Sequence, residues 1–152
     1  MILSINYADK NFESARKWNT LSAKYIGKPD KILEYSPEDI DPAFKEENKS
    51  ILSRKRGGGL WLWKPYIILD ALKKLNDGDY LVYTDAGAFF VKSAKNLINC
   101  MERDNADIML FEIPTIEKYF TKRETFHLME CDENFGETNQ ICGTYIVLKK
   151  TP

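Results

Sequence analysis

The residues best suited to chemistry lie in one short run, residues 56–65, with the sequence RGGGLWLWKP. Glycines let a backbone approach a ligand closely and adopt conformations that other residues avoid. We expect Pro65 to begin a helix, with Lys64 extended before it, and the free N–H groups of a helix start favour an anion. Arg56 and Lys64 flank this point, so the run suits a phosphate or diphosphate. The alternative is a flexible glycine turn whose tryptophans pack in the core.

A second candidate is Asp85, which follows the apolar segment 79–84. This segment is predicted to be a central strand of a covered sheet. Ligands of open α/β sheets bind at the carboxyl ends of the strands. A carboxylate there can bind a ribose or sugar hydroxyl, or hold a divalent cation against a diphosphate. The alternative is a turn or capping aspartate, which is common after strands.

A third group of polar side chains lies nearer the C-terminus and comprises His127, Glu130, Asp132, Glu133 and Gln140. Acids gathered in this way could surround an acceptor hydroxyl. The alternative is a solvated face, because the helical pattern of residues 118–130 is weak. Neither a general base nor a nucleophile can be assigned from the sequence.

The composition indicates one globular domain spanning residues 1–152, because 43% hydrophobic and 30% charged residues suffice for a folded core. The net charge of −1 argues against a general nucleic-acid binder. The chain has no apolar run long enough for a transmembrane segment and no signal-peptide pattern at its N-terminus, so we expect a cytoplasmic protein. The three cysteines lack CxxC spacing and are expected to be reduced thiols.

The elements that must position these residues are predicted from the hydrophobic pattern. Strands are expected at 2–7, 31–35, 79–84, 107–113 and 141–148. Helices are expected at 12–25, 42–52, 65–75 and 94–102, the first burying a stripe made of Phe12, Ala15, Trp18, Leu21 and Tyr25. This alternation predicts an α/β domain in which segments 2–7, 31–35, 79–84 and 107–112 share a mainly parallel sheet flanked by helices.

Two motifs together resemble the signature of a group of bacterial glycosyltransferase-like proteins tied to capsule and lipopolysaccharide synthesis. In that group an Arg-Gly-x-Gly-x-Trp-x-Trp-Lys-Pro segment precedes a Gly-Asp-x-x-x-Tyr-x-Asp-x-Gly segment. The matching residues here are Arg56, Gly57, Gly59, Trp61, Trp63, Lys64 and Pro65, followed by Gly78, Asp79, Tyr83, Asp85 and Gly87. The stretch with Thr138, Gln140, Gly143 and the ending KKTP is also similar, so the resemblance covers most of the chain.

The resemblance implies the nucleotide-diphospho-sugar transferase fold, GT-A, with a Rossmann-like sheet. It also implies a glycosyltransferase that moves a sugar from a nucleoside-diphosphate sugar to a glycan or lipid-linked acceptor. In this fold a strand-end Asp-x-Asp contacts the sugar nucleotide and a divalent cation, Mn²⁺ or Mg²⁺. Asp85 matches the first aspartate and would be the metal ligand, whereas Gly87 replaces the second. A partner could come from elsewhere, or Arg56 and Lys64 could neutralise the diphosphate without metal.

The resemblance therefore assigns a set of substrate-binding residues: Arg56, Gly59, Trp63, Lys64, Asp85, Gly87 and Gln140. Arg56 and Lys64 would face the diphosphate, and Trp63 would form a wall. Gln140 and the acids of residues 130–133 would lie on the sugar or acceptor side. Such transferases are usually longer, so we expect a truncated form, a natural minimal form or a relic without full activity. The alternative function is a non-catalytic sugar-nucleotide or glycan-binding module.

Overall fold

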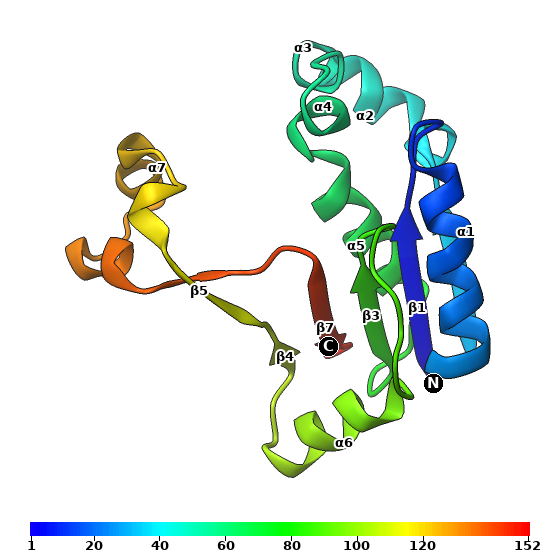
Figure 1. Cartoon of the computed structure of the whole chain (residues 1–152). Coiled ribbons are helices and arrows are strands. Elements are labelled where there is room, and N and C mark those ends of the chain that lie inside the picture. Colours follow the sequence, from blue (N-terminus) through cyan, green and yellow to red (C-terminus); the bar gives the residue numbers. More distant parts are fainter.

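The computed structural model describes the backbone of residues 1–152 and every side chain except that of Glu133. The chain has an α/β fold built on a five-stranded mixed sheet flanked by helices (Figure 1). The strand order is β2 (Lys31–Tyr35), β1 (Ile2–Tyr7), β3 (Tyr80–Thr84), β7 (Tyr145–Lys149) and β4 (Ile108–Met109). The expected α/β class is confirmed.

The three strands at one side of the sheet, β2, β1 and β3, pair in parallel, as the alternation of strands and helices predicted. β7 pairs antiparallel with both β3 and β4, so β4 points in the same direction as the first three strands. The predicted segments 2–7, 31–35 and 79–84 share this sheet, whereas the segment predicted at 107–112 contributes only Ile108–Met109 and has Glu112 in a second sheet. The five-stranded sheet is mixed rather than mainly parallel. The reason is β7: its apolar residues predict a buried strand, but they do not indicate whether that strand runs parallel or antiparallel to its neighbours.

Helices cover both faces of the sheet. On one face α5 (Trp63–Lys73) packs its buried residues against β1 and β3; this core includes Leu3, Ile5, Ile67, Ala71, Leu81 and Tyr83. On the other face α6 (Lys95–Arg103) packs against β3 and β7; this core includes Tyr80, Val82, Ile98, Met101 and Val147. Because alternate residues of β3 enter the two cores, all five residues of this strand are buried.

The helix α1 (Glu13–Ser22), continued by a π-helical turn (Ala23–Gly27), does not bury the stripe that its sequence predicted. The aromatic members of that stripe are exposed to solvent: Phe12 58%, Trp18 60% and Tyr25 64%. Asn19 and Ala23 are buried instead. The sheet beneath this helix offers polar groups at its carboxyl edge, and a polar side chain satisfies them better than an aromatic ring.

The remaining predicted helices are confirmed with shifted bounds. The segment 42–52 forms two short helices, α2 (Pro42–Glu47) and α3 (Lys49–Leu52), and the side chain of Asp41 caps the first. α5 begins at Trp63, so Lys64 is helical rather than extended. Pro65 is tolerated there because an N–H in the first turn has no intrahelical acceptor. The helices that the structure describes are all too short or too polar to span a bilayer.

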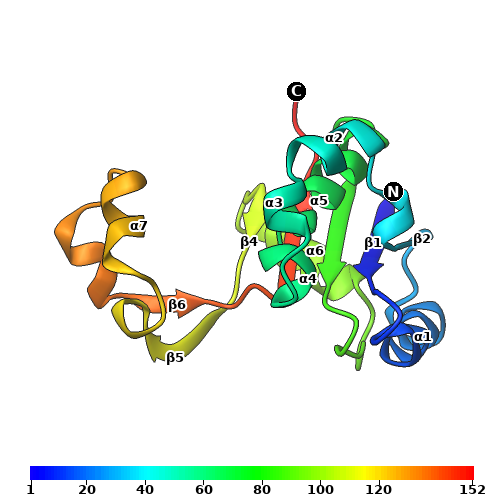
Figure 2. The ribbon, with the colours of Figure 1, turned by 90° about the horizontal axis from the view of Figure 1, so that it is seen from above.

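An arm formed by the residues between β4 and β7 projects from the sheet (Figures 1 and 2). It contains β5 (Glu112–Ile116), α7 (Arg123–Leu128) and β6 (Asn139–Ile141), with 3-10 turns at Glu117–Tyr119 and Glu133–Glu137. The single strands predicted at 107–113 and 141–148 are therefore each divided between sheet and arm. Pro114 lies inside β5, because both strands of a two-stranded hairpin are edges and an edge tolerates a missing N–H.

Candidate functional site

A cleft of about 540 Å³ opens at the carboxyl ends of β1 and β3. Its lining comes from five segments that are distant in the sequence. They are the end of β1 (Tyr7, Ala8, Asp9), the start of α1 (Asn11, Phe12), the glycine motif (Lys55, Gly57, Gly58, Trp61, Trp63), the segment after β3 (Asp85, Ala86, Gly87, Ala88) and the root of β7 (Thr144, Tyr145). Cavities of this size hold small ligands and cofactors.

The glycine motif forms one edge of this cleft as a left-handed turn that includes α4 (Gly57–Leu60). Five consecutive residues have positive φ: Gly57 60°, Gly58 55°, Gly59 96°, Leu60 52° and Trp61 60°. This conformation costs a residue with a Cβ about 1–2 kcal/mol. The glycines adopt it freely, whereas Leu60 and Trp61 store strain, which is common where a chain is shaped for binding. Trp63 Nε1 donates to Gly57 O at 3.0 Å and braces the turn.

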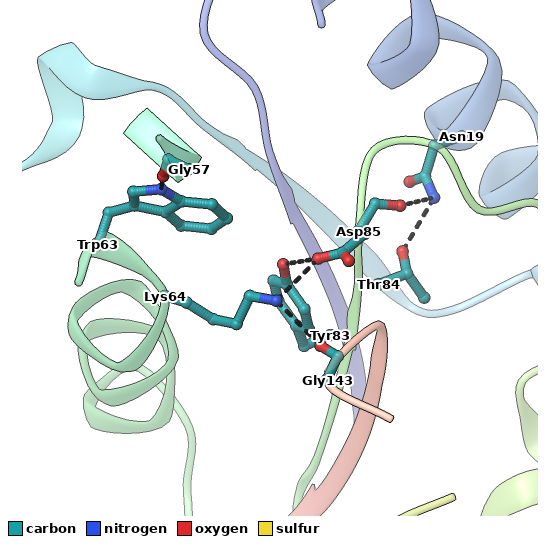
Figure 3. A network of polar contacts seen from close by, with 8 residues as sticks. All are labelled: Asn19, Gly57, Trp63, Lys64, Tyr83, Thr84, Asp85 and Gly143. Carbon is teal, nitrogen blue, oxygen red and sulfur yellow. Dashed lines mark hydrogen bonds and ion pairs between the residues drawn. The ribbon is translucent and has the colours of Figure 1, made fainter. Parts of the chain in front are cut away.

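Asp85 forms an ion pair with Lys64 (Figure 3). Among the side chains that the structure describes, this is the only ion pair that includes a carboxylate of the cleft lining. Lys64 Nζ donates to Asp85 Oδ1 at 3.0 Å and to Gly143 O at 3.0 Å. The hydroxyl of Tyr83 donates to the same Oδ1. Both donors reach Oδ1, so Oδ2 is left without a donor from the described part of the chain. The Asp85 side chain is 38% exposed, whereas that of Lys64 is 17% exposed.

The electrostatics of this cluster keep Tyr83 a hydrogen-bond donor. Burial raises the pKa of Tyr83 far above its ordinary value, and the neighbouring negative charge of Asp85 raises this pKa further. The phenol therefore stays protonated at neutral pH. The Lys64 ammonium lies 5.0 Å from the centroid of the Tyr83 ring and 5.7 Å from that of Trp63. Both rings can stabilise the cation through their faces.

An aromatic stack supports the cleft from the side of α5. The rings of Tyr7 and Trp63 lie 3.8 Å apart between centroids and are inclined by 12°. Both side chains are buried. Trp63, predicted as a wall of the binding site, thus lines the cleft and also belongs to the core.

Asn19, which was not among the predicted site residues, holds the segment after β3 in place (Figure 3). Asn19 is fully buried, and its Nδ2 lies within hydrogen-bond distance of Thr84 Oγ1 at 2.9 Å, Ala88 O at 2.8 Å and Asp85 O at 3.3 Å. Its Oδ1 accepts from Asn6 Nδ2 at 2.7 Å. The only signal for it in the sequence is a polar residue between the apolar positions Trp18 and Leu21.

The donor set around Asp85 does not fit a divalent metal ion. Among the described side chains, no three acidic, histidine or cysteine groups converge at one point. Asp85 Oδ1 already accepts from Lys64 and Tyr83, and Gly87 offers no side chain. The cation facing this carboxylate is the Lys64 ammonium.

The other residues that the resemblance assigned to the site lie in different surroundings. Of these four residues, only Gly87 lines the cleft. Arg56 is exposed beside the cleft lining, with its guanidinium 5.8 Å from the ring centroid of Trp61. Gly59 is buried, and a Cβ there would lie 2.7 Å from Leu52 Cα, so this glycine serves packing. Gln140 lies in β6, within the arm, and is not among the cleft residues.

The third group of polar residues is also carried by the arm. His127 lies on α7 and Glu130 follows it. Asp132 accepts from Asn134 N at 2.8 Å, as a helix cap does. The side chain of Glu133 lies outside the described residues. This placement favours the solvated-face alternative for the described members of the group.

The helix start near Asp85 offers fewer free amides than the sequence predicted. Pro65 has no N–H, and Lys64 N donates to Trp61 O at 2.9 Å. The side chain of Lys64 is therefore the stronger candidate for an anion than the amides of the α5 terminus. No protein-family model, curated protein or solved structure matches the chain.

Proposed function

We propose that this chain is the nucleotide-sugar-binding domain of a GT-A-type glycosyltransferase that moves a sugar from a nucleoside-diphosphate sugar to a glycan or lipid-linked acceptor. The observation that carries the proposal is that Asp85, which lines a cleft at the carboxyl end of β3, is paired with Lys64. A fixed carboxylate beside a fixed ammonium suits a ligand that combines hydroxyl groups with phosphates. The parallel core β2-β1-β3 supports the proposal, because nucleotides bind at this edge of such sheets.

Asp85, Trp63 and Tyr7, which line the cleft, and Lys64, which reaches it through Asp85, each have a role on this proposal. Oδ2 of Asp85 accepts a hydrogen bond from a ribose or sugar hydroxyl, while Oδ1 stays with its protein donors. Lys64 has three N–H donors, of which two are engaged by Asp85 and Gly143. Its third donor and its charge serve a phosphate oxygen. The Tyr7–Trp63 stack provides a rigid wall.

The chemical step would place most demand on the leaving group. The bond between the anomeric carbon and the phosphate oxygen breaks, and the nucleoside diphosphate leaves with the electron pair. The acceptor oxygen forms the new bond to the anomeric carbon, and its proton passes to the leaving diphosphate or to water. A fixed positive charge lowers the barrier because it stabilises charge that grows on the leaving oxygen. Lys64 supplies this charge without a metal ion.

A non-catalytic binding module is the second candidate, and one observation favours it. The two carboxylates of the cleft both have protein partners: Asp9 Oδ1 accepts from Asn11 N at 2.9 Å, and Asp85 is held by Lys64 and Tyr83. Each carboxylate thereby has at least one oxygen engaged by the protein. A site that binds a sugar nucleotide without turning it over would have this appearance.

The test is a thermal-shift and calorimetric survey of nucleoside diphosphates and their sugars, each with EDTA or with Mn²⁺. A ligand present at a hundred times its Kd stabilises the folded state by about 2.7 kcal/mol. We expect at least one nucleoside-diphosphate sugar to bind in EDTA. Release of nucleoside diphosphate in the presence of glycan or lipid acceptors would distinguish a transferase from a binding module. Absence of any shift at millimolar ligand would reject both.

A further inference from the structure

The outward face of α1 carries an apolar stripe that no other part of the described structure covers. Trp18, Leu21 and Tyr25 recur at three- and four-residue steps, and the two aromatic rings are mostly exposed. Ile26 in the following turn is 45% exposed. Figures 1 and 2 show α1 along the outer side of the sheet domain, away from the arm. A helix with both aromatic rings in water is unusual unless the surface binds something.

Lysines flank this stripe. Lys17 and Lys24 each precede an aromatic residue by one position, so they form a parallel row beside it, and both are exposed. Residues 10–28 contain five basic side chains and one acidic side chain, whereas the rest of the chain contains 17 basic and 22 acidic side chains. The positive charge of an otherwise acidic protein is thus concentrated around the exposed rings.

The loop after β3 extends the same surface. Phe90 N donates to Ser22 Oγ at 3.0 Å, and Ala94 N donates to Gly27 O at 2.8 Å, so this loop lies against the end of α1. The loop exposes Phe89 (57%) and Val91 (83%), with Lys92 beside them. Residues 89–94 also line an apolar cavity of about 400 Å³ that continues to Phe111 and Val147.

The geometry points to a membrane-binding surface, in which α1 and the loop at residues 89–92 lie on an anionic phospholipid bilayer. Amphipathic helices with basic residues beside tryptophan bind in the interfacial plane of such bilayers, and Trp and Tyr prefer the headgroup level. At ten residues, α1 is suited to lying on a bilayer rather than crossing it. An apolar protein partner would not require the row of lysines, whereas anionic headgroups would.

This surface also bears on the candidate site. Phe12 at the start of α1 and the segment 85–88 both line the cleft. Docking through α1 and the adjoining loop would therefore hold the cleft close to the bilayer, where a lipid-linked acceptor resides. That last consequence rests on the proposed function, but membrane binding itself does not.

The experiment is flotation of the whole chain with vesicles of phosphatidylcholine alone or of phosphatidylcholine with about 30% phosphatidylglycerol. We expect binding to the anionic vesicles at low salt and its loss at high salt, because exposed charges are screened. Each lysine near an anionic surface contributes about a fivefold factor to the partition coefficient. Lys17→Ala combined with Lys24→Ala should therefore weaken binding about 25-fold, and Trp18→Ser with Tyr25→Ser should weaken it at least tenfold.

Matched controls alter equivalent residues elsewhere on the surface. Tyr119→Ser removes a ring that is 73% exposed on the arm, and Lys49→Ala with Lys73→Ala removes two exposed lysines of other helices. These variants should float like the parent chain. Circular dichroism and melting verify that each variant is folded. No flotation with anionic vesicles, or equal loss in the control variants, would overturn the inference. A concentration-dependent dimer that Trp18→Ser abolishes, without vesicle binding, would assign the surface to a second copy instead.

Discussion

Replacing Asp85 by Asn separates a binding role from a structural role, because Asn keeps the shape and removes the charge. The backbone bonds around this residue, from Asp85 N to Thr144 O and from Ala88 N to Asp85 O, do not involve the side chain. An amide oxygen can still accept from Lys64 and Tyr83, but both bonds lose the assistance of the negative charge. Since the pair is partly exposed, we expect a loss of about 1 kcal/mol in the free energy of unfolding.

For a domain of this length such a loss lowers Tm by about 2–4 °C. The effect on binding should be larger, because a hydrogen bond to a charged group contributes about 1.5–3 kcal/mol. Calorimetry with a nucleoside-diphosphate sugar should therefore show a Kd raised at least tenfold. If the variant binds the ligand as tightly as the parent chain while melting slightly earlier, Asp85 only shapes the turn and the proposed site is wrong.

Four further perturbations follow from the geometry. Lys64→Ala should weaken binding of a nucleoside diphosphate by about 1.5–3 kcal/mol and leave the free nucleoside nearly unaffected; equal loss for both in calorimetry would mean that Lys64 only supports the fold. In a titration followed by electron paramagnetic resonance, Mn²⁺ should not bind the parent chain tightly, and tight binding would contradict the proposed metal-free site. The double variant Gly87→Asp with Lys64→Ala should gain Mn²⁺ affinity, because a Cβ at position 87 meets no atom within 4 Å and the new carboxylate can join Asp85. Burial raises the pKa of Tyr83 in the folded state, so above pH of about 10 this phenol ionises more readily in the unfolded state and the free energy of unfolding should fall. Tyr83→Phe should make this decrease with pH less steep in alkaline unfolding curves, and an unchanged slope would contradict the prediction. Gly58→Ala should lower the free energy of unfolding, measured with denaturant, by about 1–2 kcal/mol, because φ is positive there but the added Cβ has space. Gly59→Ala should lower it more, because its Cβ would also meet Leu52. Equal losses for the two variants would refute this ranking.

The sequence predicted the fold around Asp85 better than the contacts of its side chain. Apolar runs and their spacing sufficed for the strands β1, β2 and β3, and the position of Asp85 after β3 placed it at the ligand-binding edge. The sequence predicted Arg56 or Lys64 opposite Asp85 but could not distinguish the two, because only the packing of α5 on β3 brings Lys64 to this carboxylate. The position of Gln140 on the arm rather than in the cleft lining also depends on tertiary structure, because no local pattern distinguishes a strand of the sheet from a strand of the arm.

The orientation of α1 shows where a periodicity argument fails. Its aromatic residues recur as a core-facing stripe would, yet the sheet edge beneath it presents polar groups that require Asn19. A buried polar group without a partner costs about 1–3 kcal/mol, whereas exposing a ring is tolerable when another surface can cover it. The helix therefore turns its polar residue inward and its rings outward. The same orientation of α1 places Asn19 against the segment that carries Asp85 and exposes the basic aromatic surface. One arrangement of the helix therefore supports the cleft and forms the proposed membrane-binding surface.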